Sequence, residues 1–187
     1  MFTILKEHRG FGKQNLILAK NELIKTYKGA VIGPLWAVVK PAFTIFVYWF
    51  AFSCGIKQLK TLHLDIGGAQ PFSIDFFTFM FIGIIPWFFI QDSITQGAKE
   101  LRINRQFITK VKFPVSTILT YTEVSRLFVH LILMAFMYAY VLFTIGPSWY
   151  NLQFFLYCPL MFIFFLALTW STAPMSAFSK DFESLIV

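Results

Sequence analysis

The chain has 187 residues, of which 57% are hydrophobic and 13% are charged. Soluble proteins carry charge on about a quarter of their residues, so this composition excludes an ordinary soluble domain and indicates a membrane protein. Sixteen Lys and Arg against nine Asp and Glu give a net charge of +7. The basic residues lie mostly between apolar runs and do not form one solvated face, which argues against nucleic-acid binding.

Residues 14–28 have the pattern of an amphipathic helix. Its apolar side chains fall on one arc at helical periodicity: Leu16, Ile17, Ala19, Leu23, Ile24 and Tyr27. Leu18 falls outside this arc. A basic helix next to a membrane span most often lies flat among the lipid headgroups, so we expect an interfacial helix. A soluble helix packed on the cytosolic side is the alternative.

Four apolar runs are long enough to cross a bilayer as helices. They cover residues 33–56, 76–98, 118–143 and 152–178, with outer loops at 57–75 and 144–151. Lys40 is the only charged residue in the first run. The predicted fold class is therefore an all-α polytopic membrane protein with four transmembrane helices and an amino-terminal interfacial helix, organised as a single transmembrane domain over residues 1–187.

The distribution of Lys and Arg predicts the orientation of these spans. Eleven lie in the segment up to Lys28 or in the connector between the second and third spans, and two lie in the outer loops. Cytoplasmic loops of membrane proteins carry an excess of Lys and Arg. Both termini of this chain are therefore expected in the cytosol, which agrees with an even number of spans.

The connector between the second and third spans, residues 99–114 (KELRINRQFITKVKFP), is called the basic connector below. Six apolar residues interrupt its five Lys and Arg: Leu101, Ile103, Phe107, Ile108, Val111 and Phe113. As a helix it would present both a charged and an apolar surface, which is suited to docking on another protein. A solvated connector that only sets the topology is the alternative interpretation.

Three ionisable residues fall inside the predicted spans at comparable depth, given the helical rise. Asp92 lies in the second span, and Glu123 and Arg126 lie in the third. A guanidinium flanked by two carboxylates avoids an unpaired charge in hydrocarbon. We expect a structural clamp between neighbouring spans. A proton or ion relay and the lining of a wet pathway are the alternatives.

Three aromatic residues, Tyr48, Trp49 and Trp87, lie deep in the predicted spans. They are far from the headgroup level, where Trp and Tyr are enriched. Their polar tips need partners, so we expect them to face protein or water and not lipid. Packing between spans is one explanation. A path for sugars is the other, because flat aromatic faces can slide along the apolar faces of pyranose rings.

The sequence contains no motif for chemistry of its own. It has no G-x-x-x-x-G-K-[ST] loop, no evident Ser/His/Asp or Cys/His constellation, and no H-E-x-x-H or paired-Cys motif. We therefore expect no catalytic residue, no metal and no cofactor on this chain. Any work that the protein performs would draw its energy from a partner.

Three blocks carry a resemblance to a known family; in chain order they are residues 27–41 (YKGAVIGPLWAVVKP), 83–87 (GIIPW) and 107–114 (FITKVKFP). They resemble the membrane subunits of type-2 ABC exporters, in the branch that exports lipid-linked polysaccharides such as O-antigens and wall teichoic acids. Lys180 and Asp181 give a weaker match. That family has six spans, so the resemblance implies that the last two are absent from this chain.

The resemblance implies a permease subunit in the bacterial cytoplasmic membrane. It would pair with a second copy of itself and with a cytosolic ABC ATPase that binds ATP and Mg²⁺, and its other partners would be membrane lipids and a lipid-linked glycan. The basic connector would be the coupling helix, which contacts the ATPase through Arg105, Phe107, Ile108, Lys110, Lys112, Phe113 and Pro114. Alternatives are a type-2 exporter of a drug or lipid, a membrane-bound enzyme acting on lipid-linked sugars, and a structural subunit without transport.

Overall fold

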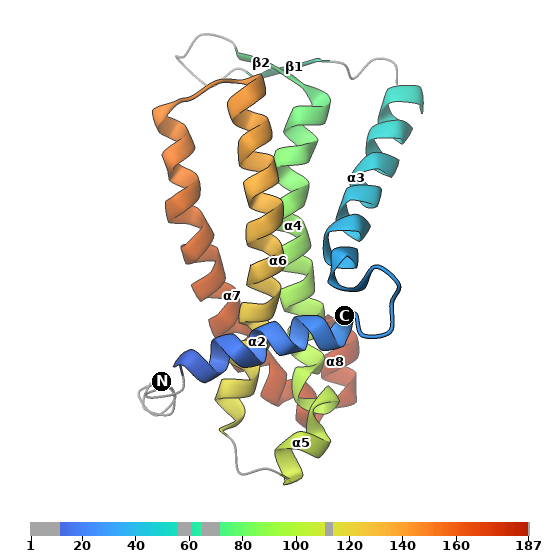
Figure 1. Cartoon of the computed structure of the whole chain (residues 1–187), viewed down its shortest axis with the longest axis vertical. Helices are drawn as coiled ribbons and strands as arrows, with labels where there is room; N and C mark the ends of the chain where they lie inside the picture. Colours follow the sequence, from blue (N-terminus) through green and yellow to red (C-terminus); the bar gives the residue numbers. More distant parts are fainter. Residues whose placement is uncertain (1–11, 56–60, 65–71, 111–113, 187) are drawn as a thin grey trace.

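The computed structural model describes residues 12–55, 61–64, 72–110 and 114–186. Within these ranges, four helices are long and apolar enough to cross a membrane. They are α3 (Trp36–Gly55), α4 (Phe76–Ile103), α6 (Val115–Thr144) and α7 (Gln153–Phe178). The prediction of an all-α polytopic membrane protein with four spans is confirmed (Figure 1).

Shorter elements gather at the two ends of these helices. They are α2 (Gly12–Thr26), η1 (Gly33–Leu35), β1 (Thr61–Leu64), β2 (Phe72–Asp75), α5 (Arg105–Lys110), η2 (Trp149–Leu152) and α8 (Lys180–Ile186). Strands β1 and β2 pair antiparallel, with Thr61 opposite Asp75, in a segment that the sequence predicted only as a loop. We call this end of the molecule the hairpin end. The opposite end, where α2, α5 and α8 lie (Figure 1), is the connector end.

Local sequence explains where several elements begin. The Asp75 carboxylate accepts a hydrogen bond from the Phe77 amide at 3.0 Å and so caps the first turn of α4. The chain turns between α2 and α3 at Gly29 and Gly33, whose positive φ angles of 89° and 53° are tolerated best by glycine. Pro114 precedes the first residue of α6; it has no amide hydrogen to leave unpaired at a helix start.

Helices α4, α6 and α7 form a bundle, and α3 stands to one side of it (Figure 1). The buried apolar core is made of Ile45, Ile85, Leu133 and Met137. Only Ile45 in this core comes from α3. Large side chains on the rest of that helix, including Phe43, Phe46 and Phe50, are exposed within this single chain, so the other helices leave much of α3 uncovered.

Helix α2 lies across α6 at the connector end (Figure 1). Ala19 is fully buried against Ile118 and Tyr121, and Leu18 packs on the same cluster. Only part of the apolar arc predicted from the sequence therefore packs against protein. Its members Leu16, Ile17 and Ile24 are exposed. The small side chain of Ala19 lets the two helices approach closely. The larger apolar side chains need no protein cover where lipid can contact them.

Candidate functional site

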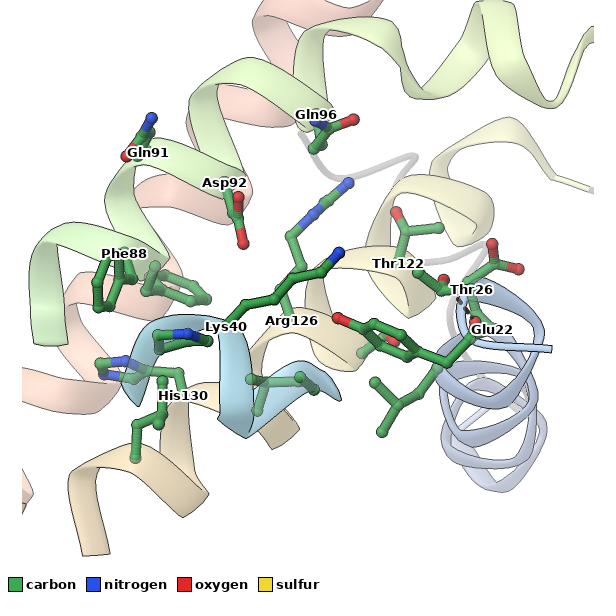
Figure 2. A pocket seen from close by; sticks show the side chains of 18 of the residues that line it. Glu22, Thr26, Lys40, Phe88, Gln91, Asp92, Gln96, Thr122, Arg126 and His130 are labelled. Atoms are coloured by element: carbon green, nitrogen blue, oxygen red, sulfur yellow. Dashed lines mark hydrogen bonds between the residues drawn. The ribbon is translucent and has the colours of Figure 1, made fainter. Parts of the chain in front are cut away.

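A polar cavity of about 540 Å³ lies between α2, α3, α4 and α6, towards the connector end. Its lining includes six ionisable side chains from all four helices: Glu22, Lys40, Asp92, Glu100, Arg126 and His130. Figure 2 shows Lys40, Asp92 and Arg126 projecting from three different helices into the same space. Charged residues inside membrane segments are costly and mark functional or pairing sites, so this cavity is the candidate site.

Arg126 is held by two buried carboxylates. Its Nη2 lies 2.6 Å from Oε2 of Glu100, and its Nη1 lies 3.1 Å from Oε1 of Glu123. The pairing of Arg126 with Glu123 follows the sequence-based expectation. Within the described residues the second carboxylate is Glu100 and not Asp92, which is exposed in the cavity. The expectation for Asp92 is therefore corrected.

The direction of helical side chains explains this correction. Side chains of an α-helix tilt towards its amino terminus, and α6 begins at Val115, at the connector end. The long side chain of Arg126 therefore reaches towards the end of α4, where Glu100 lies. Asp92 lies eight residues earlier in α4, about two helical turns away from that level.

Glu123 joins three helices. Besides Arg126, it accepts hydrogen bonds from the Ser93 hydroxyl of α4 at 3.0 Å and the Thr169 hydroxyl of α7 at 2.7 Å. Gly97 permits this meeting, because a Cβ at that position would lie 2.8 Å from Thr169 Oγ1 and 3.3 Å from Glu123 Oε1. The carboxylate is fully buried, so these donors supply the stabilisation that water would otherwise give.

The basic connector is joined to this network at its first residues. Asn104, between α4 and α5, donates from Nδ2 to Oε1 of Glu100 at 2.7 Å. Arg102 forms an ion pair with Glu183 of α8 at 2.8 Å and donates to the Ser176 carbonyl of α7 at 2.6 Å. The end of α4 is thus tied to α6, α7 and α8 before the chain enters α5.

The predicted coupling residues lie at the connector end. Of those in α5, Arg105, Phe107 and Lys110 are exposed, and Ile108 packs on the cluster between α2 and α6. Lys112 and Phe113 lie outside the described residues, and Pro114 precedes α6. Helix α5 thus turns one apolar side chain to the protein and leaves a mixed basic and aromatic surface outside. This surface is compatible with docking on another protein.

The three deep aromatic residues do not form one group. Tyr48 and Trp87 line a groove of about 890 Å³ between α3 and α4. The ring of Trp49 lies 5.9 Å from that of Phe46 on α3. Tyr48, Trp49 and Trp87 are 46%, 42% and 56% exposed, so within this chain they are not packed between spans. Whether they line a sugar path stays a prediction.

Three residues of the cavity were not singled out as site residues from the sequence. The Lys40 ammonium lies 5.8 Å from the centre of the Tyr27 ring, within the range of a cation–π contact. Burial raises the pKa of Tyr27, and the nearby Asp92 carboxylate adds to this, so its hydroxyl is protonated at neutral pH. His130 is buried, and both its ring nitrogens lack a hydrogen-bond partner among the described residues. A lone Lys or His inside an apolar run is the sequence signal for such positions.

The described residues contain no group of three or more His, Cys, Asp or Glu that could hold a metal ion. The chemistry of the cavity is instead that of hydroxyls, amides and paired charges. Such a lining can hydrogen-bond a polar group inside the membrane. It does not resemble the donor set of a catalytic metal centre.

Comparison with known proteins gives one consistent result. Over all 187 residues the chain is 25% identical to the O-antigen export system permease protein RfbA of Myxococcus xanthus, of which it covers 67%. Two O-antigen export system permease proteins RfbA of Klebsiella pneumoniae are 26% and 27% identical over 115 and 116 residues, 61% of this chain and 39% of each relative. No protein-family model matches the chain. These relatives confirm the resemblance to permeases of the O-antigen export branch.

Proposed function

We propose that this chain is a permease subunit of an ATP-driven exporter that moves lipid-linked polysaccharide of the O-antigen type across the bacterial cytoplasmic membrane. The observation that carries this proposal is the similarity to an O-antigen export permease along the entire chain. The four spans with a basic surface at one end fit a transport subunit.

Energy for export would come from a separate cytosolic ABC ATPase, which binds ATP and Mg²⁺. Helix α5 would contact this partner, because it presents Arg105, Phe107 and Lys110 on the outside of the connector end. The excess of Lys and Arg at this end supports a cytosolic location. Both ends of the chain would then face the cytosol, and nucleotide binding by the ATPase would push on α5.

A second copy of the chain would be needed to form the route. A polysaccharide carries many hydroxyls, and each one that loses water without a new partner costs several kcal/mol, roughly 2–7. A bundle of four helices has no room to enclose such a chain. The exposed aromatic face of α3, with the groove that contains Tyr48 and Trp87, supports a route between two copies that includes this helix.

The polar cavity would receive a sugar near the lipid-linked end of the substrate. It opens beside α2, at the membrane face where a lipid-linked substrate made in the cytosol arrives. Its lining carries Glu22, Asp92 and Glu100 against Lys40 and Arg126, and Arg126 is already held by two carboxylates. Hydroxyl groups therefore fit this lining better than a phosphate would.

The decisive experiment changes the charge of the basic connector, the segment proposed to contact the ATPase. Phe113→Asp places a negative charge in the basic connector and should leave membrane insertion intact while it abolishes surface polymer and copurification of the ATPase. Asn21→Asp is the matched control, because it adds the same charge to an exposed position of α2 at the same end. Normal recovery of the ATPase with Phe113→Asp would contradict the coupling role.

The neighbouring reading frame offers a simpler test of the function. An adjacent ATPase with a Walker loop is expected for an exporter. A glycosyltransferase without such an ATPase would favour a membrane-bound enzyme acting on lipid-linked sugars. An intact ATPase complex that supports no polymer at the cell surface would instead favour a type-2 exporter of another cargo.

A further inference from the structure

The buried polar contacts around Arg126 and Glu123 also bear on how a displacement of α5 would be transmitted to the transmembrane helices. We propose that Asn104, Glu100, Arg126, Glu123 and Thr169, called the relay below, are positioning residues that make α5 move together with α4, α6 and α7 as one body. Helix α3 would then be the span that moves against this body. This inference rests on the proposed function, in which an ATPase pushes on α5.

The relay is continuous from the connector to the third helix of the bundle. Asn104 donates to Glu100 at 2.7 Å, and Glu100 pairs with Arg126 at 2.6 Å. Arg126 pairs with Glu123 at 3.1 Å, and Glu123 accepts from Thr169 at 2.7 Å. Each link joins two side chains directly, so a displacement of the start of α5 is transmitted through polar contacts to α6 and α7.

Burial makes these links stiff. Asn104, Glu100, Glu123 and Thr169 are 8%, 5%, 0% and 1% exposed. In such surroundings a broken link leaves an unsatisfied polar group or an unpaired charge, which costs more than in water. The other ties at this end run from Arg102 to Glu183 and to the Ser176 carbonyl; the Arg102 side chain is 36% exposed, so these contacts are weaker than the buried ones.

Helix α3 lies outside the relay. Among the described residues, none of the hydrogen bonds and ion pairs that form the relay involves α3. Both the polar cavity and the groove with Tyr48 and Trp87 lie between α3 and the bundle. A push that moves α4, α6 and α7 together therefore changes the space beside α3, where the proposed substrate contacts are.

Paired spin labels on the intact complex with its ATPase, in lipid nanodiscs, test this division. The first pair reports the distance from α5 to α7 and combines Gln106→Cys with Ser171→Cys. The second pair reports the distance from α3 to α7 and combines Val47→Cys with Ser171→Cys. All these positions are exposed, and Cys54 and Cys158 are replaced by Ser. With Mg-ATP and vanadate, we expect the α5–α7 distance to stay constant and the α3–α7 distance to change.

The relay is then broken at either end, by one substitution at each. Thr169→Val removes the hydroxyl that binds Glu123, and Asn104→Ala removes the amide that binds Glu100. Thr172→Val is the matched control, because the Thr172 hydroxyl bonds only to the Leu168 carbonyl of its own helix at 3.0 Å among the described residues. We expect nucleotide to change the α5–α7 distance in both relay variants and not in the control.

Transport efficiency gives a second readout. Each relay variant should lower the polymer exported per ATP hydrolysed by about fivefold, a usual size for changes in coupling. The double variant should lose no more than either single variant, because both interrupt the same series of contacts, whereas independent sites add. Thr172→Val should retain the wild-type ratio.

The outcomes separate the relay from the proposed function. Failure of the ATPase to copurify with the wild-type chain would overturn the proposed function and the relay with it. A wild-type complex in which α5 moves against α7, or equal behaviour of Thr169→Val and Thr172→Val, would overturn the relay alone. Additive losses in the double variant would also overturn it.

Discussion

The two halves of the bundle are stabilised by different kinds of contact. In the half nearer the hairpin end, Ile85, Leu133 and Met137 pack as a buried apolar core. In the half nearer the connector end, the centre of the bundle is occupied by the carboxylate of Glu123 and its partners. Helices α4 and α6 thus change from apolar packing to a polar network along their length, and α7 joins that network through Thr169.

This difference shows what each kind of contact contributes inside a membrane. Lipid tails are as apolar as the side chains of the core, so apolar packing between helices gains shape complementarity but no hydrophobic driving force. A polar network is directional, because each donor needs one acceptor at a given distance. The apolar half therefore supplies packing, and the polar half fixes how α4, α6 and α7 are rotated and aligned.

The largest effect should come from removing the cation of the polar half. Arg126→Met leaves Glu100 and Glu123 buried without their counter-charge, and breaking a buried pair costs about 3–5 kcal/mol. Unfolding by SDS titration in mixed micelles, followed by tryptophan fluorescence, measures this loss.

Arg105→Met is the control for Arg126→Met, because this exposed residue of α5 should leave the free energy of unfolding nearly unchanged. If Arg126→Met folds normally and exports at the wild-type rate, Arg126 has no functional role.

A cavity in the apolar half should have the next largest effect. Met137 is fully buried in the core, so Met137→Ala removes dispersion contacts and is expected to cost about 2–4 kcal/mol. Met175→Ala, at an exposed position of α7, should cost far less in the same SDS titration. Equal losses for the two variants would show that packing in the apolar half is loose.

Gly97 tests how closely the helices must approach in the polar half. Gly97→Ala places a methyl group 2.8 Å from Thr169 Oγ1, and overpacking of this kind costs about 1–3 kcal/mol. Gly83→Ala is the matched control in the same helix, because its Cβ would meet no atom within 4 Å and alanine favours the helix by up to about 1 kcal/mol. Thermal unfolding in detergent should therefore move in opposite directions for the two variants.

The smallest effect is expected from a single polar contact between α4 and α6 in the apolar half. The Tyr140 and Thr78 hydroxyls lie 3.0 Å apart, and the Tyr140 ring contacts Phe77 and Phe81. Tyr140→Phe retains the ring contacts and loses one hydrogen bond, worth about 1 kcal/mol. A loss in thermal stability as large as that of Gly97→Ala would contradict the view that directional contacts matter mainly in the polar half.

The sequence alone determined the number, positions and order of the spans. In a chain with so little charge, apolar runs long enough to cross a bilayer indicate transmembrane helices. Their positions can be read from the sequence, because they do not depend on tertiary contacts. The pairing of Arg126 with Glu123 also followed from the sequence, because the contact is local: the two residues lie three apart on one helix.

Only the tertiary structure decided which distant residues meet. The depth of a residue in a span follows from the helical rise, but its partner depends on helix rotation and on side-chain direction. For this reason Arg126 reaches Glu100 and not Asp92. The same rotation turns Leu18 towards α6 and leaves Leu16 exposed. Periodicity defines the faces of a helix, whereas the neighbouring helices determine which face is buried.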